Sequence, residues 1–165
     1  MMYKTLFIAI LCMWAYTGKA QSHQKTGIHF FKGSWAEVLQ ASNETGKPIF
    51  VDAYAVWCGP CKWMDRNTFK DSTVAAFYNA NFINYKFDME KGEGRKFSTT
   101  YKIAVYPTLL YLNAKGEVKH REMGGKRAEQ FIELGKKALN QFDLRVSDDK
   151  QNKQKGTESF EEIED

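Results

Sequence analysis

Residues 49–62 read IFVDAYAVWCGPCK, a short apolar run followed at once by two cysteines that lie three positions apart. Within the run, over 49–55, the only charged residue is Asp52. This length and continuity are typical of a strand that is buried on both faces of a sheet. We expect a helix to begin at the cysteines. The sequence therefore places Cys58 and Cys61 between a buried strand and the first turn of a helix.

The alternation of strands and helices continues on both sides of this stretch. Ser34 and Glu37 have the spacing of a capping box, which predicts a helix that starts there and stops near Gly46. Residues 113–116 have the composition of a turn, so the strands beside them should form an antiparallel hairpin. The other expected elements are strands at 28–31, 81–88, 107–112 and 117–123, and helices at 58–69, 72–79, 126–142 and one ending near Tyr101. This order predicts an α/β fold with a central mixed β-sheet and helices on both of its faces.

The cysteine pair has four common explanations, which the neighbouring residues help to distinguish. A zinc site needs four ligands, and the histidines His23, His29 and His120 are scattered at unsuitable spacings. Covalent haem attachment needs a histidine directly after the second cysteine, where this chain has Lys62. An inert structural disulfide across so short a loop would add little stability, because the entropic effect grows with loop length. We therefore favour a redox-active pair, with no metal and no cofactor beyond the disulfide itself.

A helix that starts on the cysteines gives them different chemical properties. Cys58 lies at the helix N-terminus, where free backbone N–H groups and the helix dipole favour a thiolate. The thiolate is the nucleophile of disulfide exchange, so Cys58 is the predicted attacking residue. Cys61 follows one turn later and is the predicted resolving thiol, which breaks the mixed disulfide. Pro60 is tolerated because it lies in the first turn, where its missing N–H is not needed.

Three separate stretches resemble the thioredoxin family. Residues 57–62 (WCGPCK) match its active-site motif, and residues 50–52 (FVD) and 106–108 (YPT) match as well. The similarity covers roughly residues 33–142, and the chain looks most like the exported thioredoxin-like proteins of bacteria. The resemblance implies the thioredoxin fold and a thiol–disulfide oxidoreductase that works through the two cysteines.

The resemblance also assigns roles to residues around the cysteines. Pro107 matches the family's cis-proline, which lies against the cysteines and lets the preceding backbone pair with a substrate strand. Asp52 matches a buried acid that serves as proton acceptor for the resolving thiol. The residues that the resemblance implies for substrate binding are Trp57, Gly59, Pro60 and Tyr106.

Two positions depart from the family pattern, and one of them is Tyr106, which is larger or more polar than the usual family choices before the proline. The other concerns the partner of Asp52. Many thioredoxins have a lysine on the third strand that pairs with the buried acid, and strand register places Asn84 at that position here. Lys86 lies on the same face two residues later and is the alternative partner for Asp52. The sequence leaves open which of these two residues tunes the acid.

The first twenty residues have the layout of a secretory signal peptide, with Lys4 near the start and an uncharged, mainly apolar run over 6–16. A helix of eleven residues is too short to cross a bilayer, so we expect cleavage after Ala20 rather than a membrane anchor. Cys12 would leave with this segment. The mature chain would then keep a single pair of cysteines, in an oxidising compartment where such a pair can form a disulfide.

The composition of the remaining chain suggests three parts. Residues 21–32 are mostly polar and form the expected N-terminal leader, and residues 33–142 form the expected thioredoxin-like domain. Residues 143–165 are highly charged and lack a buried pattern, which predicts a disordered tail. The net charge of the whole chain is +4, without a basic stripe that carries interleaved aromatic residues. Nucleic-acid binding is therefore not expected.

The leading functional hypothesis is a periplasmic or secreted reductant that acts on the disulfides of exported client proteins. The Gly-Pro dipeptide between the cysteines resembles that of the reducing thioredoxins. Such a reductant must be recharged, which implies a membrane electron donor, and we expect the protein to be a monomer. Two alternatives stay open: an oxidase or isomerase in the same compartment, and a redox-inactive binding module with the same fold.

Overall fold

The computed structural model describes residues 27–142, so the expected signal peptide, most of the leader and the charged tail lie outside the described residues. This part of the chain forms a sheet in the strand order β2-β1-β3-β4. The strands are β1 (Ile49–Tyr54), β2 (Ile83–Asp88), β3 (Thr108–Leu112) and β4 (Val118–Met123). β1 and β2 are parallel, whereas β3 is antiparallel to both of its neighbours. The predicted mixed sheet is therefore confirmed.

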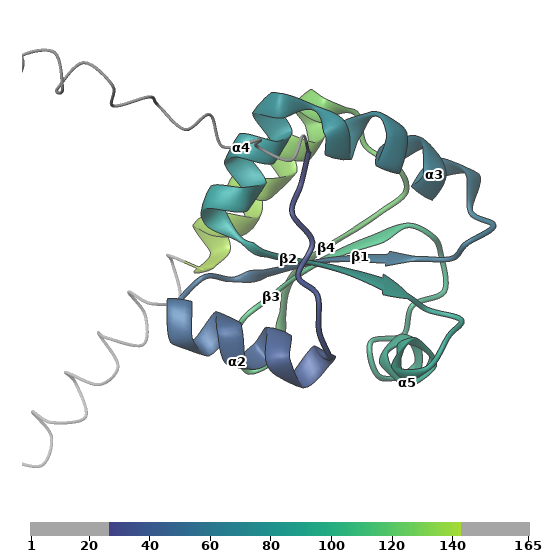
Figure 1. Ribbon diagram of the computed structural model, residues 1–165, viewed down its shortest axis with the longest axis vertical. Coiled ribbons are helices and arrows are strands. Elements are labelled where there is room, and N and C mark those ends of the chain that lie inside the picture. The colour runs from purple at the N-terminus through teal and green to yellow at the C-terminus, as the bar shows by residue number, and fades with distance from the viewer. Residues whose placement is uncertain (1–26, 143–165) are drawn as a thin grey trace, which may run out of the picture.

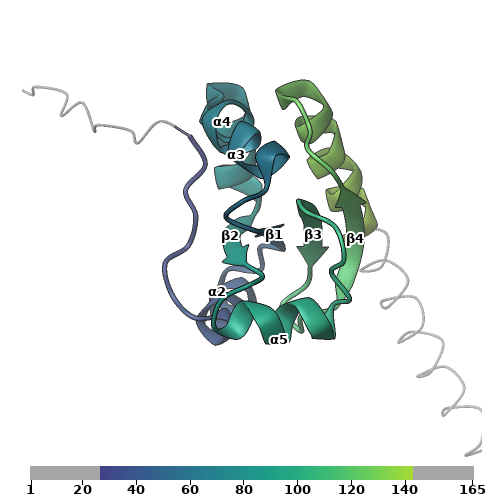
Figure 2. The same cartoon turned by 90° about the vertical axis from the view of Figure 1, so that its right-hand side faces the viewer.

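Helices cover both faces of the sheet (Figure 1), and the perpendicular view in Figure 2 shows the same two layers. One face carries α2 (Trp35–Thr45) and α5 (Glu93–Thr100). The other carries α3 (Gly59–Arg66), α4 (Ser72–Asn81) and a C-terminal helix at 128–142, with a 3₁₀ helix, η1 (Thr68–Lys70), between α3 and α4. None of the helices in the described part of the chain is long and apolar enough to cross a membrane.

Side chains of β1 alternate between two hydrophobic clusters, one on each face of the sheet. Val51 and Ala53 belong to the cluster that α2 and α5 cover. Phe50 belongs to the cluster that α4 and the C-terminal helix cover, together with Met64 of α3. Because side chains alternate along a strand, Asp52 lies on the same face as Phe50. The sheet therefore directs a charged group into the layer that contains α3.

α2 begins and ends where its sequence predicts. Ser34 is the N-cap residue, and its Oγ accepts a hydrogen bond from the backbone N–H of Glu37. The Glu37 carboxylate in turn accepts from the backbone N–H of Ser34 at 2.7 Å, which completes the capping box. Gly46 ends the helix in the left-handed conformation, with φ of 69°.

The expected strand at 28–31 is wrong, since this segment forms only an isolated bridge between Phe30 and Asn84 of β2. The backbone N–H of Ile28 bonds instead to the carbonyl of Phe69 in η1, at 2.8 Å. The segment therefore runs from η1 to β2 and pairs with β2 at a single bridge.

Three expected helices also have different boundaries. The helix predicted over 72–79 extends to Asn81, so the strand predicted from 81 begins at Ile83. The helix predicted over 58–69 breaks at Asn67 into α3 and η1, and the Asn67 side chain donates to the carbonyl of Trp63. The last helix begins at 128 and not at 126, because the N–H of Lys126 bonds to Sδ of Met64 and that of Arg127 to a side-chain oxygen. At Asn67 a side-chain donor binds a backbone carbonyl, whereas at Lys126 and Arg127 side-chain acceptors bind backbone N–H groups. In both places side-chain hydrogen bonds compete with the helical pattern.

Candidate active site

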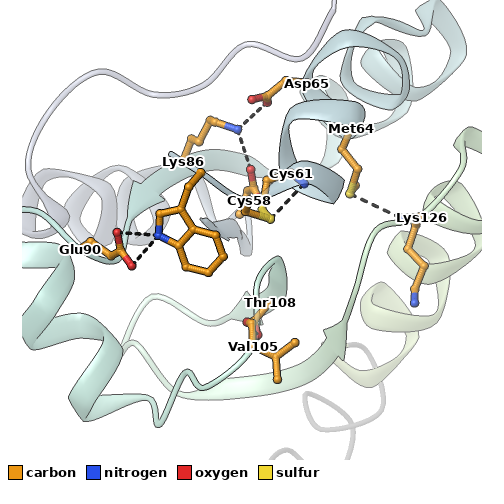
Figure 3. The surroundings of a disulfide bond; sticks show 11 residues. Cys58, Cys61, Met64, Asp65, Lys86, Glu90, Val105, Thr108 and Lys126 are labelled. Atoms are coloured by element: carbon orange, nitrogen blue, oxygen red, sulfur yellow. Dashed lines mark hydrogen bonds and ion pairs between the residues drawn. A yellow bond between two sulfur atoms is a disulfide. The ribbon is translucent and has the colours of Figure 1, made fainter. Parts of the chain in front are cut away.

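The two cysteines form a disulfide at the start of α3 (Figure 3). Cys58 is the N-cap residue, and its Sγ accepts a hydrogen bond from the backbone N–H of Cys61 at 3.2 Å. Gly59 and Pro60, which separate the cysteines, are exposed in the first turn. The predicted placement between a buried strand and a helix start is confirmed. Once the disulfide is reduced, this placement favours a thiolate on Cys58.

Both cysteines are almost inaccessible to solvent, with exposed fractions of 2% for Cys58 and 1% for Cys61. They form a small cluster with Ala55, against which Tyr54 and Tyr106 pack. A client disulfide would therefore have to approach closely, over the residues that border the cluster. Tyr106 comes from a loop far along the chain, and this contact is made only in the folded protein.

The loop that contributes Tyr106 is fixed by backbone geometry. The peptide bond between Tyr106 and Pro107 is cis, as the resemblance implied. The carbonyl of Pro107 accepts a hydrogen bond from the N–H of Gly124, at 2.8 Å, just beyond the end of β4. Oγ1 of Thr108 donates to the carbonyl of Val105 at 2.7 Å, and Figure 3 shows both residues below the cysteines. These two hydrogen bonds hold the loop so that Tyr106 packs against the cysteines.

Trp57 is an exposed aromatic residue beside the disulfide, and 64% of it is accessible to solvent. Its indole N–H donates to both carboxylate oxygens of Glu90, each at 2.9 Å. Its ring also makes an edge contact with Tyr106, with centroids 5.8 Å apart. Arg95 donates to the backbone carbonyl of Glu90 at 2.7 Å. The indole is therefore held in one orientation at the surface, by a glutamate that the sequence did not single out.

Replacing Glu90 with alanine should release the indole of Trp57. We expect the indole N–H resonance to shift upfield and to exchange faster with water, because its acceptor is gone. KM for a disulfide-bonded client should rise about three- to tenfold, with kcat unchanged. A change of this size corresponds to the net free energy of one hydrogen bond. Glu129→Ala, which removes an exposed acid from the C-terminal helix, is the control. An unmoved indole resonance would show that Glu90 does not hold the ring.

A second network lies on the face of the sheet that α3 covers. Asp52 of β1 is 1% exposed, and Lys86 of β2 is its partner in the parallel register. Nζ of Lys86 lies 2.8 Å from Oδ2 of Asp52 and also donates to Oδ1 of Asp65 on α3 (Figure 3). The side chain of Lys86 is 20% exposed and that of Asp65 is 40% exposed. One ammonium thus connects a buried carboxylate with one that reaches solvent. No motif in the sequence indicates this role for Asp65.

Burial and the neighbouring charges shift the pKa of Asp52 in opposite directions. Burial raises the pKa of Asp52, Lys86 lowers it and Asp65 raises it, with a net result above the ordinary value. Burial lowers the pKa of Lys86, but the two carboxylates more than offset this effect. Oδ1 of Asp52 has no hydrogen-bond partner among the described residues, which leaves it available for a proton. Within residues 27–142, no group of three or more His, Cys, Asp or Glu residues is arranged to hold a metal ion.

The structure also decides between the two partners that the sequence left open for Asp52. Asn84 is buried, and its Nδ2 donates to the carbonyl of Tyr78 and to Oδ1 of Asn79, each at 3.3 Å. It is therefore engaged with α4. Lys86 is the residue that contacts the acid.

A disulfide at a helix N-terminus, beside a loop with a cis-proline and on a mixed four-stranded sheet, defines a protein of the thioredoxin fold. Comparison with known families agrees, since residues 31–114 match the family described as Thioredoxin-like. This match covers a little over half of the 165 residues. The chain belongs to the thioredoxin-like family.

Individual relatives show how much of the chain is shared. A thioredoxin-like protein of Synechocystis is 34% identical over 100 residues, which cover 61% of this chain and 87% of the relative. The thiol:disulfide interchange protein DsbD of Ralstonia nicotianae is 30% identical over 105 residues, covering 62% of this chain but 17% of DsbD. The chain thus spans about a fifth of the length of the DsbD relatives that it matches. The solution structure of a proposed disulphide-isomerase from Bacteroides thetaiotaomicron is 41% identical, with a TM-score of 0.63, and covers 70% of this chain and 96% of that one.

Proposed function

We propose that this protein reduces disulfides in exported client proteins by dithiol–disulfide exchange. The observation that carries the proposal is the bonded pair of Cys58 and Cys61, with the first sulfur at the N-cap of α3. A helix N-terminus stabilises negative charge, so the reduced pair holds Cys58 as the reactive thiolate. The similarity to a thioredoxin-like protein and to DsbD supports the same class of chemistry.

The exchange runs in two steps that conserve electrons. The thiolate of Cys58 attacks one sulfur of the client disulfide, a mixed disulfide forms, and the other client sulfur leaves as a thiolate. The thiolate of Cys61 then attacks Sγ of Cys58, which forms the internal disulfide and expels the second client sulfur. The client gains two electrons, and the dithiol of this protein is oxidised.

The surrounding residues divide between client binding and proton transfer. Trp57, Gly59 and Pro60 are exposed beside the cysteines, and a Cβ at Gly59 would meet no atom within 4 Å, so a client backbone has room there. Tyr106 and Pro107 bring the neighbouring loop to the same place. We assign client binding to these five residues. Asp52, buried and with one unpartnered oxygen, is assigned as the proton acceptor for the resolving thiol.

The proposed location is outside the cytoplasm, in the periplasm or the medium. The signal-peptide pattern of residues 1–20 supports this location, with cleavage near Ala20. A reductant that works there must regain two electrons after each turnover, so we propose a membrane electron donor as its partner. The protein acts as a monomer and uses no cofactor beyond its own disulfide.

The second candidate function is an oxidase or isomerase of the same compartment. It is favoured by the similarity to the Bacteroides thetaiotaomicron protein described as a proposed disulphide-isomerase. The reduction potential against glutathione separates the two functions. A reduction potential of about −270 mV supports the reductant, and one above about −180 mV supports the oxidase or isomerase.

A Cys61→Ser variant tests whether the protein exchanges disulfides at all. This variant keeps the attacking thiol but lacks the resolving one, so client proteins should accumulate as mixed disulfides through Cys58. The adducts are separated on non-reducing gels and should disappear with a reducing agent. The double variant that also carries Cys58→Ser should form none. Absence of adducts from Cys61→Ser would favour a redox-inactive binding module.

A further inference from the structure

Lys86 has an unusual environment for a lysine side chain. Its Nζ lies 4.4 Å from the ring centroid of Tyr54 and 5.3 Å from that of Phe69. Aromatic faces attract a cation, but they do not replace a hydrogen-bonding anion for an ammonium that is mostly buried. Within residues 27–142, the anions that pair with this ammonium are Asp52 and Asp65. The cation is therefore shared by two carboxylates of very different exposure.

We propose that Asp65 is a positioning residue that retains the Lys86 ammonium when Asp52 takes up the proton of Cys61. This inference deepens the proposed function and rests on it, because the proton belongs to the resolving step. It gives Asp65, near the end of α3, a role in proton transfer without any contact with the client.

The charge balance of the network explains why a second acid matters. With both acids ionised, two carboxylates and one ammonium carry a net charge of −1, which favours protonation of the buried member. After Asp52 is neutralised, Lys86 and Asp65 remain as a neutral pair. Without Asp65, the same protonation would leave Lys86 as a largely buried cation with no counter-ion, which is strongly unfavourable.

The proton transfer can be written atom by atom. The S–H bond of Cys61 breaks, its proton bonds to a carboxylate oxygen of Asp52, and the sulfur keeps the electron pair. Oδ2 of Asp52 is engaged by Lys86, so the unpartnered Oδ1 is the oxygen available to the proton. The thiolate then attacks Sγ of Cys58, and the client sulfur leaves with the electron pair of the broken bond. The proton passes from Asp52 to solvent before the next turnover.

The other titratable groups near the network do not replace Asp65. Tyr54 of β1 faces the ammonium, but burial raises the pKa of its hydroxyl, which stays neutral at physiological pH. Asp88, at the end of β2, raises the pKa of Tyr54, and its Oδ2 lies 3.6 Å from Nζ of Lys91. η1 contributes the uncharged ring of Phe69. Among the described residues of α3, Asp65 is the one that forms an ion pair with Lys86.

An Asp65→Asn variant tests this inference, because it removes the charge and keeps the size of the side chain. In the reduced protein, the ¹³C resonance of the Asp52 carboxyl should titrate at lower pH than in wild type, since Lys86 then pairs with Asp52 alone. Client release from the mixed disulfide should slow about three- to tenfold near pH 7. The difference should become smaller at high pH, where hydroxide replaces Asp52 as the base for the thiol. Asp65→Glu should restore both measurements.

Glu133→Gln is the matched control, since it removes one carboxylate from an ion pair with Lys136 on the C-terminal helix. It should leave the titration of Asp52 unchanged. The inference is overturned if Asp65→Asn does not move that titration, if client release keeps its rate, or if release slows equally at every pH. The titration of Asp52 is measured without a client, so it tests the charge network on its own. The proposed function is refuted separately if the wild-type protein never releases a client.

Discussion

Replacing Cys58 with serine is expected to abolish disulfide reduction, with turnover lowered by about a thousandfold or more. A serine hydroxyl stays protonated at neutral pH and forms no mixed disulfide. The N-terminus of α3 and the N–H of Cys61 stabilise a thiolate at position 58, and the variant has no thiol there. The appearance of free thiols from a disulfide-bonded peptide, with excess reductant to recharge the protein, measures the loss.

Cys61→Ser is the matched comparison for this loss. It should react once, with one equivalent of client bound through Cys58 and no further turnover. Both variants should unfold at the same temperature as the reduced wild-type protein, which separates chemistry from folding. Turnover by Cys58→Ser, or client adducts that form through Cys61 in that variant, would show that the attacking and resolving roles are assigned the wrong way round.

Replacing Lys86 with methionine is expected to lower the free energy of unfolding by about 3–5 kcal/mol at pH values where Asp52 is ionised. Asp52 is buried, and Lys86 is the cation within hydrogen-bond distance of it among the described residues. Loss of the ammonium would leave the carboxylate buried without a counter-charge. Urea-induced unfolding of the oxidised protein, followed across a pH series, measures the change.

The loss should depend on pH, because Asp52 can avoid it by taking up a proton. Burial already raises the pKa of Asp52 above its ordinary value of 3.8, and removal of Lys86 raises it further. The folded protein then binds more protons than the unfolded chain, so stability falls as pH rises from the ordinary value through the raised folded value. The deficit of the variant is therefore smallest near pH 4 and largest above the raised pKa.

Two further variants identify the origin of that deficit. Adding Asp52→Asn to Lys86→Met should restore most of the stability, because no buried charge remains. Lys136→Met, which breaks an exposed ion pair with Glu133, should change stability little at any pH. A loss that is independent of pH, or that persists after Asp52→Asn, would point to lost packing against the aromatic rings and not to charge.

The site therefore contains two side-chain networks with separate tasks in the proposed reaction. Glu90 and Tyr106 orient the exposed indole of Trp57, where a client would dock. Lys86 and Asp65 set the protonation of Asp52 beneath α3. The Glu90 variant should change KM, whereas the Asp65 variant should change the resolving step and its pH dependence.

The local elements and the class of the site can be predicted from the order of the amino acids. The apolar run at 49–55, the capping box of Ser34 and the turn at 113–116 are read from neighbouring residues, and the structure confirms the elements that they predict. The cysteine pair at a helix start follows from the same local pattern. These features could be predicted because backbone propensity, capping and side-chain periodicity act over a few residues.

Which charged and polar groups contact one another depends on how the helices and strands pack in the folded chain. Strand register across β1 and β2 places Lys86, and not Asn84, against Asp52, and the docking of α3 on the sheet adds Asp65. The loop after β2 likewise brings Glu90 to Trp57. These contacts join elements whose relative positions are set by packing of the whole core, so no short stretch of sequence contains the information. The same packing buries Asp52. A carboxylate removed from water is stabilised by the few polar groups within hydrogen-bond distance, so these contacts determine whether Asp52 is charged.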